Sequence, residues 1–313
     1  MAGTARVLRN AFSWSHSRHE TFRDCPRRYF YHYYGSWGGW SPDAEPRARQ
    51  LYILKNLKGR QAWAGGVVHD AVADTLRLVR AGRPVPPEAG RDAAEGAVAR
   101  MRREFRESRD GAYRTRPKQA LGLVEHHYRE VVPDAEWRAQ ADAVRLAVLR
   151  FHEGPYLDEV RTLAADAWLA LEDLASFELD GTPVFVRLDL AVRSPDDRVT
   201  VVDWKTGRRA PHPEGLQLGT YALYVHEQWH VAPEAITVRE VNLTAGAEAE
   251  ARVAVEQVER AREAIRGSIR EMRALLADPA ENRADEANFA ARPGPRTCAY
   301  CSFREACPDR PSG

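Results

Sequence analysis

The sequence predicts an α/β protein in which helices flank a mixed central sheet and a helical insertion interrupts the core. Three observations predict this fold. Apolar, strand-like segments recur in the second half of the chain, at 167–171, 184–192, 199–203 and 235–243. Helical patterns follow at 214–228 and 248–277. A charge-rich stretch over 91–163 repeats apolar residues three to four positions apart, which is typical of packed helices.

The composition is that of a folded protein. The 313 residues are 44% hydrophobic and include eight Trp, eleven Tyr and nine Phe, which excludes a disordered chain. No apolar run approaches the roughly 20 residues that cross a bilayer, and the first ten residues lack the apolar segment of a secretory signal. We therefore expect a cytoplasmic protein without a membrane partner. The net charge of +1 favours no class of partner.

Changes in composition divide the chain into five predicted segments. They are an N-terminal helical segment with one cysteine (1–64), the first core helix (65–90), the helical insertion (91–163), the core strands and helices (164–277) and a C-terminal cysteine region (278–313). Ser17 and Glu20 have the spacing of a capping box, which predicts a helix start. Gly65 and Gly66 are predicted to open the helix that carries His69, where the missing side chains allow close backbone approach.

A carboxylate and a lysine end one apolar strand. Asp203 and Lys205 are two residues apart, so both side chains point to one face. Asp189 lies within the preceding apolar strand, where a carboxylate needs a cation or a hydrogen-bonding partner. A hairpin of the two strands would bring Asp189 and Asp203 together. Two carboxylates are ligands that Mg²⁺ or Mn²⁺ prefers, and a nearby lysine can orient a water and offset charge on a phosphate.

Four cysteines form a second group of candidate ligands. Cys298, Cys301 and Cys307 lie within ten residues near the C-terminus, whereas Cys25 lies near the N-terminus. Thiolates are soft ligands that suit an iron–sulfur cluster or Zn²⁺. Either group would join the two ends of the chain and stabilise the fold.

The order of these motifs resembles the RecB-type branch of the PD-(D/E)xK nucleases. Gly65-x-x-x-His69 precedes the strand with Asp189, then Asp203-x-Lys205-Thr-Gly, then Gln217-x-x-x-Tyr221 on the following helix. The resemblance implies a restriction-endonuclease-like fold and a metal-dependent DNA nuclease. It assigns six catalytic residues: His69, Asp189, Asp203, Lys205, Gln217 and Tyr221.

The resemblance also implies a role for each residue. In that branch the histidine and the two acids bind Mg²⁺ or Mn²⁺ together with a backbone carbonyl, here that of Trp204. The lysine acts on the attacking water, while Gln217 and Tyr221 support the site and the DNA backbone. Many members carry a glutamate ahead of the aspartate strand, so we expect a secondary role for Glu172.

The cysteines match the iron–sulfur members of this family, which include AddB-type and CRISPR-associated nucleases. In those members one cysteine ahead of the nuclease core joins three behind it to hold a 4Fe–4S cluster. The resemblance therefore implies that Cys25, Cys298, Cys301 and Cys307 ligate such a cluster. A structural Zn²⁺ in a four-cysteine site is the alternative.

The resemblance implies an exonuclease that acts on single-stranded DNA or on DNA ends, in repair, recombination or anti-phage and CRISPR-type defence. The segment 27–34 is basic and aromatic, so it could grip a single strand, or pack beside the cysteines. Two other functions remain open: a catalytically silent nucleic-acid-binding subunit of a helicase–nuclease complex, and a nuclease directed at RNA. No Gly-x-x-x-x-Gly-Lys-[Ser/Thr] motif occurs, so a helicase or a defence or repair partner would be a separate chain.

Overall fold

The computed structural model describes residues 8–310, which form two compact units. The first unit comprises 8–56, 178–184 and 265–310, and the second comprises 57–177 and 185–264. The N-terminal and C-terminal cysteines thus share the first unit, whereas the predicted catalytic residues all belong to the second. Over 8–310, no helix is both long enough and apolar enough to cross a bilayer.

The first unit is built around aromatic side chains. Its elements are β1 (Trp14–Ser15), α1 (His16–Asp24), α2 (Pro26–Phe30), the π-helical turn η1 (Tyr31–Gly35), α3 (Pro46–Lys55), β11 (Leu276–Asp278), β12 (Arg283–Ala284), η5 (Glu286–Asn288) and α11 (Pro295–Ala299). Tyr29 from α2 is fully buried, and its ring stacks on Phe289 at a centroid distance of 6.2 Å. The Trp14 indole nitrogen donates to the Ser268 hydroxyl at 3.0 Å. Residues from both ends of the chain therefore form one core.

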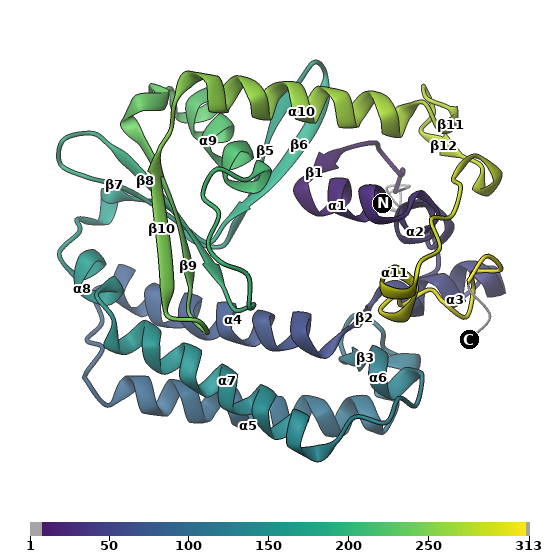
Figure 1. Cartoon of the computed structure of the whole chain (residues 1–313), viewed down its shortest axis with the longest axis horizontal. Coiled ribbons are helices and arrows are strands. Elements are labelled where there is room, and N and C mark those ends of the chain that lie inside the picture. Colours follow the sequence, from purple (N-terminus) through teal and green to yellow (C-terminus); the bar gives the residue numbers. More distant parts are fainter. Residues whose placement is uncertain (1–7, 311–313) are drawn as a thin grey trace, which may run out of the picture. The chain divides into compact units, whose positions relative to one another are not determined.

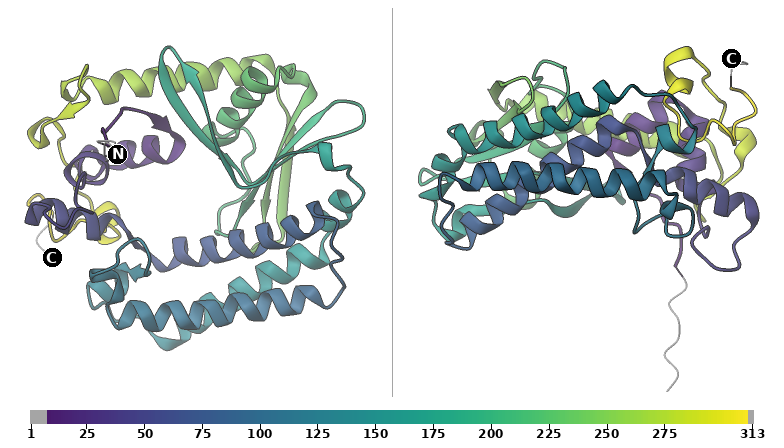
Figure 2. Two further views of the ribbon diagram at one scale, coloured as in Figure 1. Left: turned by 180° about the vertical axis from the view of Figure 1, so that it is seen from behind. Right: turned by 90° about the horizontal axis from the view of Figure 1, so that it is seen from below.

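Helices make up much of the second unit. They are α4 (Arg60–Arg80), α5 (Ala89–Arg109), α6 (Val124–His127), α7 (Asp134–Glu153), α8 (Tyr156–Arg161) and α9 (Leu216–Trp229), with short 3₁₀ turns η2 (Ala112–Arg114), η3 (Ala165–Ala167) and η4 (Pro233–Ala235). Helix α10 (Val255–Arg273) begins in this unit and continues into the first. Figures 1 and 2 show α4, α5 and α7 running alongside one another. Their apolar faces bury Val68, Val148 and Phe151 against Trp204 of the sheet, which confirms the helical pattern predicted for the insertion.

The sheet of the second unit has the strand order β10-β9-β8-β7-β4. These strands are β4 (Trp168–Ala170), β7 (Leu190–Arg193), β8 (Val199–Lys205), β9 (Ile236–Asn242) and β10 (Ala247–Arg252). Strands β8 and β9 pair in parallel and the other neighbours pair antiparallel, so the mixed sheet is confirmed. A further sheet has the order β1-β6-β5, with β5 (Asp173–Leu179) and β6 (Thr182–Leu188), and a two-stranded parallel pair joins β2 (Leu57–Lys58) to β3 (Gly122–Leu123).

The predicted strand 184–192 is two strands that separate at Asp189. Strand β6 ends at Leu188 and belongs to the three-stranded sheet, whereas β7 begins at Leu190. The expected hairpin forms between β7 and β8, with Leu190 opposite Val202. Asp189 therefore occupies the break between two strands, and its carboxylate accepts a hydrogen bond from the Trp204 amide of β8.

Several predicted boundaries differ from the structure. The predicted helix 248–277 is wrong at both ends, because 247–252 is the edge strand β10, α10 spans Val255–Arg273 and β11 begins at Leu276. Helix α4 begins at Arg60, so Gly65 and Gly66 lie in its interior. The first helix is capped by Ser15, which accepts a hydrogen bond from the Arg18 amide at 3.3 Å, and not by Ser17.

Candidate active site

Three ionisable side chains from three segments of the second unit meet at the break between β6 and β7. They are His69 on α4, Glu172 in the turn between β4 and β5, and Asp189. Nδ1 of His69 lies 3.5 Å from a Glu172 carboxylate oxygen and 3.4 Å from Oδ2 of Asp189. Potential ligand atoms of all three residues lie within 4.8 Å of one another. One nitrogen and two carboxylates form a donor set that fits Mg²⁺ or Mn²⁺.

The backbone fixes the two carboxylates of this triad relative to each other. The Glu172 amide donates to the carbonyls of Leu188 and Asp189 at 2.9 and 3.2 Å. Glu172 itself has a φ of +56°, a left-handed conformation that is uncommon outside glycine. The tight turn thus places the Glu172 side chain beside the strand break that carries Asp189.

His69 balances the charge of the two acids. Burial alone would lower the pKa of His69, but hydrogen bonds and charge from Asp189 and Glu172 raise it to about 10. The imidazole therefore carries a proton in the arrangement seen here. A divalent cation bound by the triad would displace that proton, because a histidine ligand must be neutral.

Asp203 and Lys205 lie beside the triad and share one face of β8. Lys205 Nζ lies 2.6 Å from Oδ2 of Asp203. The Asp203 side chain is only 2% exposed, whereas the Lys205 side chain is 34% exposed. Burial, and next the charge of Asp189, raise the pKa of Asp203 to about 7, although Lys205 acts in the opposite direction. The lysine therefore faces solvent and the carboxylate does not.

Gln217 on α9 joins these residues into one network. Lys205 Nζ donates to Oε1 of Gln217 at 2.9 Å, and Nε2 of Gln217 donates to Oδ1 of Asp203 at 3.1 Å. Nε2 also donates to the Tyr221 hydroxyl at 2.9 Å, one turn further along α9. Burial raises the pKa of the Tyr221 phenol, so it remains neutral.

The backbone of Trp204 faces Asp189. The Trp204 amide donates to Oδ2 of Asp189 at 2.8 Å. The amide and the carbonyl of one strand residue point to the same side, so the Trp204 carbonyl faces this edge too. On the opposite face of β8, the Trp204 indole packs edge-to-face on Phe151, with ring centroids 5.4 Å apart, which anchors the strand in the core.

The structure thus brings the predicted residues into one region but groups them differently. Glu172, for which we expected a secondary role, belongs to the triad, whereas the Asp203 carboxylate contacts Lys205 and Gln217. Metal binding by Asp203 and by the Trp204 carbonyl stays a prediction. Gly65 lies close to this region, since a Cβ there would be 3.0 Å from the Thr206 hydroxyl oxygen.

The four cysteines line one cavity of the first unit together with several arginines. The Arg292 amide donates to Cys25 Sγ at 3.4 Å, and the Gly294 amide donates to Cys298 Sγ at 3.5 Å. Burial raises the pKa of the Cys301 and Cys307 thiols. Among the described residues, no three of these sulfurs lie within 4.8 Å of one another. Four thiols on one cavity are a donor set that fits an iron–sulfur cluster.

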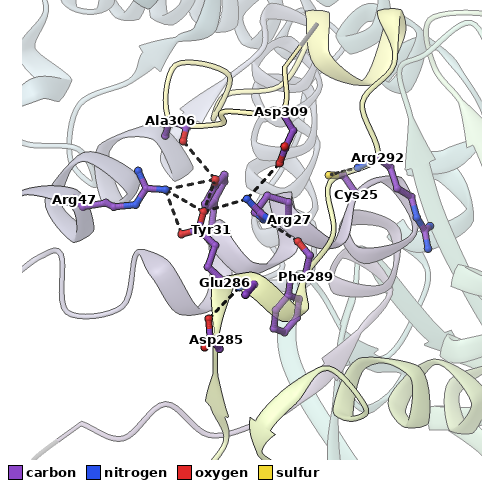
Figure 3. A network of polar contacts seen from close by, with 11 residues as sticks. Cys25, Arg27, Tyr31, Arg47, Asp285, Glu286, Phe289, Arg292, Ala306 and Asp309 are labelled. Atoms are coloured by element: carbon purple, nitrogen blue, oxygen red, sulfur yellow. Dashed lines mark hydrogen bonds and ion pairs between the residues drawn. The ribbon is translucent and has the colours of Figure 1, made fainter.

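A polar network centred on Glu286 lies next to this cavity (Figure 3). Arg27, Tyr31 and Arg47 all contact Oε1 of Glu286, at 3.2, 2.8 and 3.1 Å. Arg27 also donates to the Phe289 carbonyl at 2.7 Å. The network ties the helices that follow Cys25 to the segment that precedes the other three cysteines.

Comparison with known proteins identifies the family. The PD-(D/E)XK nuclease superfamily model matches residues 13–308, so the chain belongs to this superfamily of metal-dependent nucleases that hydrolyse phosphodiester bonds. No curated protein matches the sequence. A solved structure described as "Crystal structure of SSO0001" is 15% identical, over 60% of this chain and 93% of that chain, with a TM-score of 0.29. That likeness is too weak to carry an argument.

Proposed function

We propose that this protein is a deoxyribonuclease of the RecB-type branch, which hydrolyses single-stranded DNA or DNA ends as an exonuclease in repair, recombination or defence. The observation that carries the proposal is the His69–Glu172–Asp189 triad with Lys205 beside it. A divalent cation at the triad would supply Lewis-acid stabilisation of the phosphate.

Lys205 is the residue that would act on the reacting groups. An ammonium has three hydrogens to donate, and Asp203 and Gln217 occupy two of its directions. The third is available to orient the attacking water or to stabilise negative charge on the phosphate. Gln217 and Asp203 hold the ammonium in place in this arrangement. His69, Glu172 and Asp189 would hold the cation, with Asp203 and the Trp204 carbonyl as its further proposed ligands.

Two rings of the basic and aromatic segment 27–34 offer no surface to DNA bases. Tyr29 and Tyr31 are 0% and 1% exposed. Their rings pack against Phe289 and Phe303 inside the first unit. The alternative reading of this segment, that it packs near the cysteines, fits these two residues, while DNA contact by the partly exposed Tyr33 and Tyr34 stays a prediction.

We propose a 4Fe–4S cluster at the cysteines, with Zn²⁺ as the alternative that iron and zinc analysis decides. A tetrahedral zinc site with Zn–S bonds of about 2.3 Å places its sulfurs about 3.8 Å apart. Among the described residues, no three of the four sulfurs lie within 4.8 Å of one another, which supports the larger group. The cluster would connect residues from both ends of the chain and has no part in the hydrolytic step.

The test is cleavage of end-labelled oligonucleotides by the purified protein. With Mn²⁺ we expect shortening of single-stranded DNA, and with EDTA none. Asp189→Asn should lose both Mn²⁺ binding and cleavage, whereas Asp166→Asn, an exposed carboxylate of the same unit, should retain both. RNA run in parallel decides between the two nucleic acids. Absence of cleavage of either by folded, Mn²⁺-loaded protein would instead indicate a silent binding subunit.

A further inference from the structure

A groove in the second unit combines aromatic and arginine side chains outside the metal triad. It lies where α5 and α7 pack beside α4 and has a volume of about 450 Å³. Phe105 and Trp137 supply its aromatic surface, and Trp63, which is only 4% exposed, packs in its lining. The Phe105 and Trp137 rings are partly exposed and meet edge-to-face, with centroids 5.0 Å apart. Trp63 is held by a hydrogen bond from its indole nitrogen to Glu104 at 2.6 Å.

The charge along this groove is positive. Arg102 and Arg106, one turn apart on α5, and Arg138 on α7 line it and are exposed. Within residues 8–310, none of these three arginines forms an ion pair. The groove's remaining arginine, Arg145, is neutralised by Glu95 and by Asp142, the acidic residue of the lining, at 2.9 and 2.7 Å.

We propose that this groove binds single-stranded DNA, with the three arginines on phosphates and bases against the aromatic side chains. Proteins hold single strands with this combination of positive charge and ring surface. An acidic peptide would pair with the arginines but would leave the aromatic surface without a partner. The inference rests on the proposed function for the kind of ligand. Trp63 and His69 are six residues apart on α4, about 9 Å along its axis, so one helix links the groove to the triad.

The experiment measures binding of a fluorescent 20-nucleotide oligothymidylate to the full chain by anisotropy, in EDTA to prevent cleavage. The test variant is Arg102→Ala/Arg106→Ala. The matched control is Arg103→Ala/Arg109→Ala, which removes the same charge from exposed positions of α5 that do not line the groove. We expect the test variant to bind at least about tenfold more weakly, with a salt slope of log K reduced by about 1.4. The control should match the parent.

A second ligand tests the aromatic contribution. An abasic oligomer with the same number of phosphates should bind about tenfold more weakly than the oligothymidylate. Polyglutamate serves as the probe for an acidic peptide. The proposal is overturned if the two double variants lose the same affinity, or if neither loses any. It is also overturned if the abasic oligomer or polyglutamate binds as tightly as the oligothymidylate.

Hydrolysis of thymidine 5′-(p-nitrophenyl phosphate) with Mn²⁺ separates this inference from the proposed function, because so small a substrate needs the triad and not the groove. If the parent hydrolyses it and the test variant binds DNA normally, the groove inference fails and the nuclease stands. If no hydrolysis occurs but DNA binding depends on Arg102 and Arg106, the nuclease fails and the groove stands.

Discussion

The Gln217 side chain has one possible amide orientation. The Lys205 ammonium offers no acceptor and the Asp203 carboxylate offers no donor. Oε1 must therefore face Lys205, and Nε2 must face Asp203 and Tyr221, as the distances of 2.9, 3.1 and 2.9 Å indicate. A single amide thus sets the geometry of three other side chains, which explains why a neutral residue belongs to this site.

At the same scale, burial of a histidine predicts a pH dependence of stability. The His32 ring lies tilted against the Tyr33 ring, with centroids 4.4 Å apart. Burial, with the charges of Lys55 and Arg28, lowers the pKa of His32 to about 3. Between pH 6.5 and 3, His32 is protonated in the unfolded chain but neutral in the folded chain. The free energy of unfolding therefore decreases as the pH falls. We expect the His32 side chain to lower the free energy of unfolding by about 2 kcal/mol when the pH falls from 7 to 5.

Denaturant unfolding at both pH values measures this effect. Between pH 7 and pH 5, the free energy of unfolding of His32→Gln should fall by about 2 kcal/mol less than that of the parent. His212→Gln, at an exposed position, serves as the control and should follow the parent. An unchanged pH dependence in His32→Gln would show that the buried ring does not disfavour its proton.

Sequence predicted most of the candidate site but not its grouping. Asp203, Lys205, Gln217 and Tyr221 have fixed spacings along a strand and a helix, so periodicity places them on shared faces. Glu172 has no such spacing. Its place depends on a left-handed turn and on two long-range backbone hydrogen bonds, neither of which a local pattern encodes.

At the scale of elements, two adjacent glycines in α4 have different surroundings. A Cβ at Gly65 would lie 3.0 Å from the Thr206 hydroxyl oxygen, whereas a Cβ at Gly66 would meet no described atom within 4 Å. Alanine in a helix interior is favoured over glycine by about 0.5–1 kcal/mol. Gly66→Ala should therefore raise the free energy of unfolding by that amount, while at Gly65 the contact with Thr206 offsets the gain.

Denaturant midpoints of the two alanine variants test this asymmetry, and each variant is the control for the other. Gly65→Ala should also slow cleavage, because Thr206 follows Lys205 directly. Equal stabilisation in both variants would contradict the close approach of α4 to this loop.

Strand β10 shows where local propensity misleads at this scale. The segment 247–252 alternates alanine with charged residues, and both types favour helices, so it was predicted as the start of a helix. Its pairing with β9 decides the outcome, because β9 offers a complete set of backbone partners. The middle of the predicted helix, α10 over Val255–Arg273, has three to four-residue apolar spacing and is confirmed.

At the scale of the whole molecule, Cys25 is the one predicted cluster ligand from the N-terminal end. If it ligates a cluster, that bond closes a loop of nearly the entire chain and constrains the unfolded state. Cys25→Ser should then lower both the iron content and the melting temperature, with lower activity as a consequence of loosened support. Thermal unfolding beside iron and sulfide analysis measures this.

The control for this prediction is the metal-free protein. After chelation of iron, the parent and Cys25→Ser should melt together, because the loop is open in both. If Cys25→Ser keeps full iron occupancy and melts at the same temperature as the parent, Cys25 does not ligate the cluster.

The division of roles between the triad and Lys205 is the central claim, and single-turnover cleavage at saturating Mn²⁺ tests it most directly. Lys205→Ala should still bind Mn²⁺ but cleave end-labelled single-stranded DNA at least about 100-fold more slowly. Lys205→Arg keeps the positive charge beside Asp203 and hence the fold, but its planar fork cannot reproduce the compact ammonium, so it should also be slow. An unchanged rate in either folded, Mn²⁺-binding variant would contradict the claim.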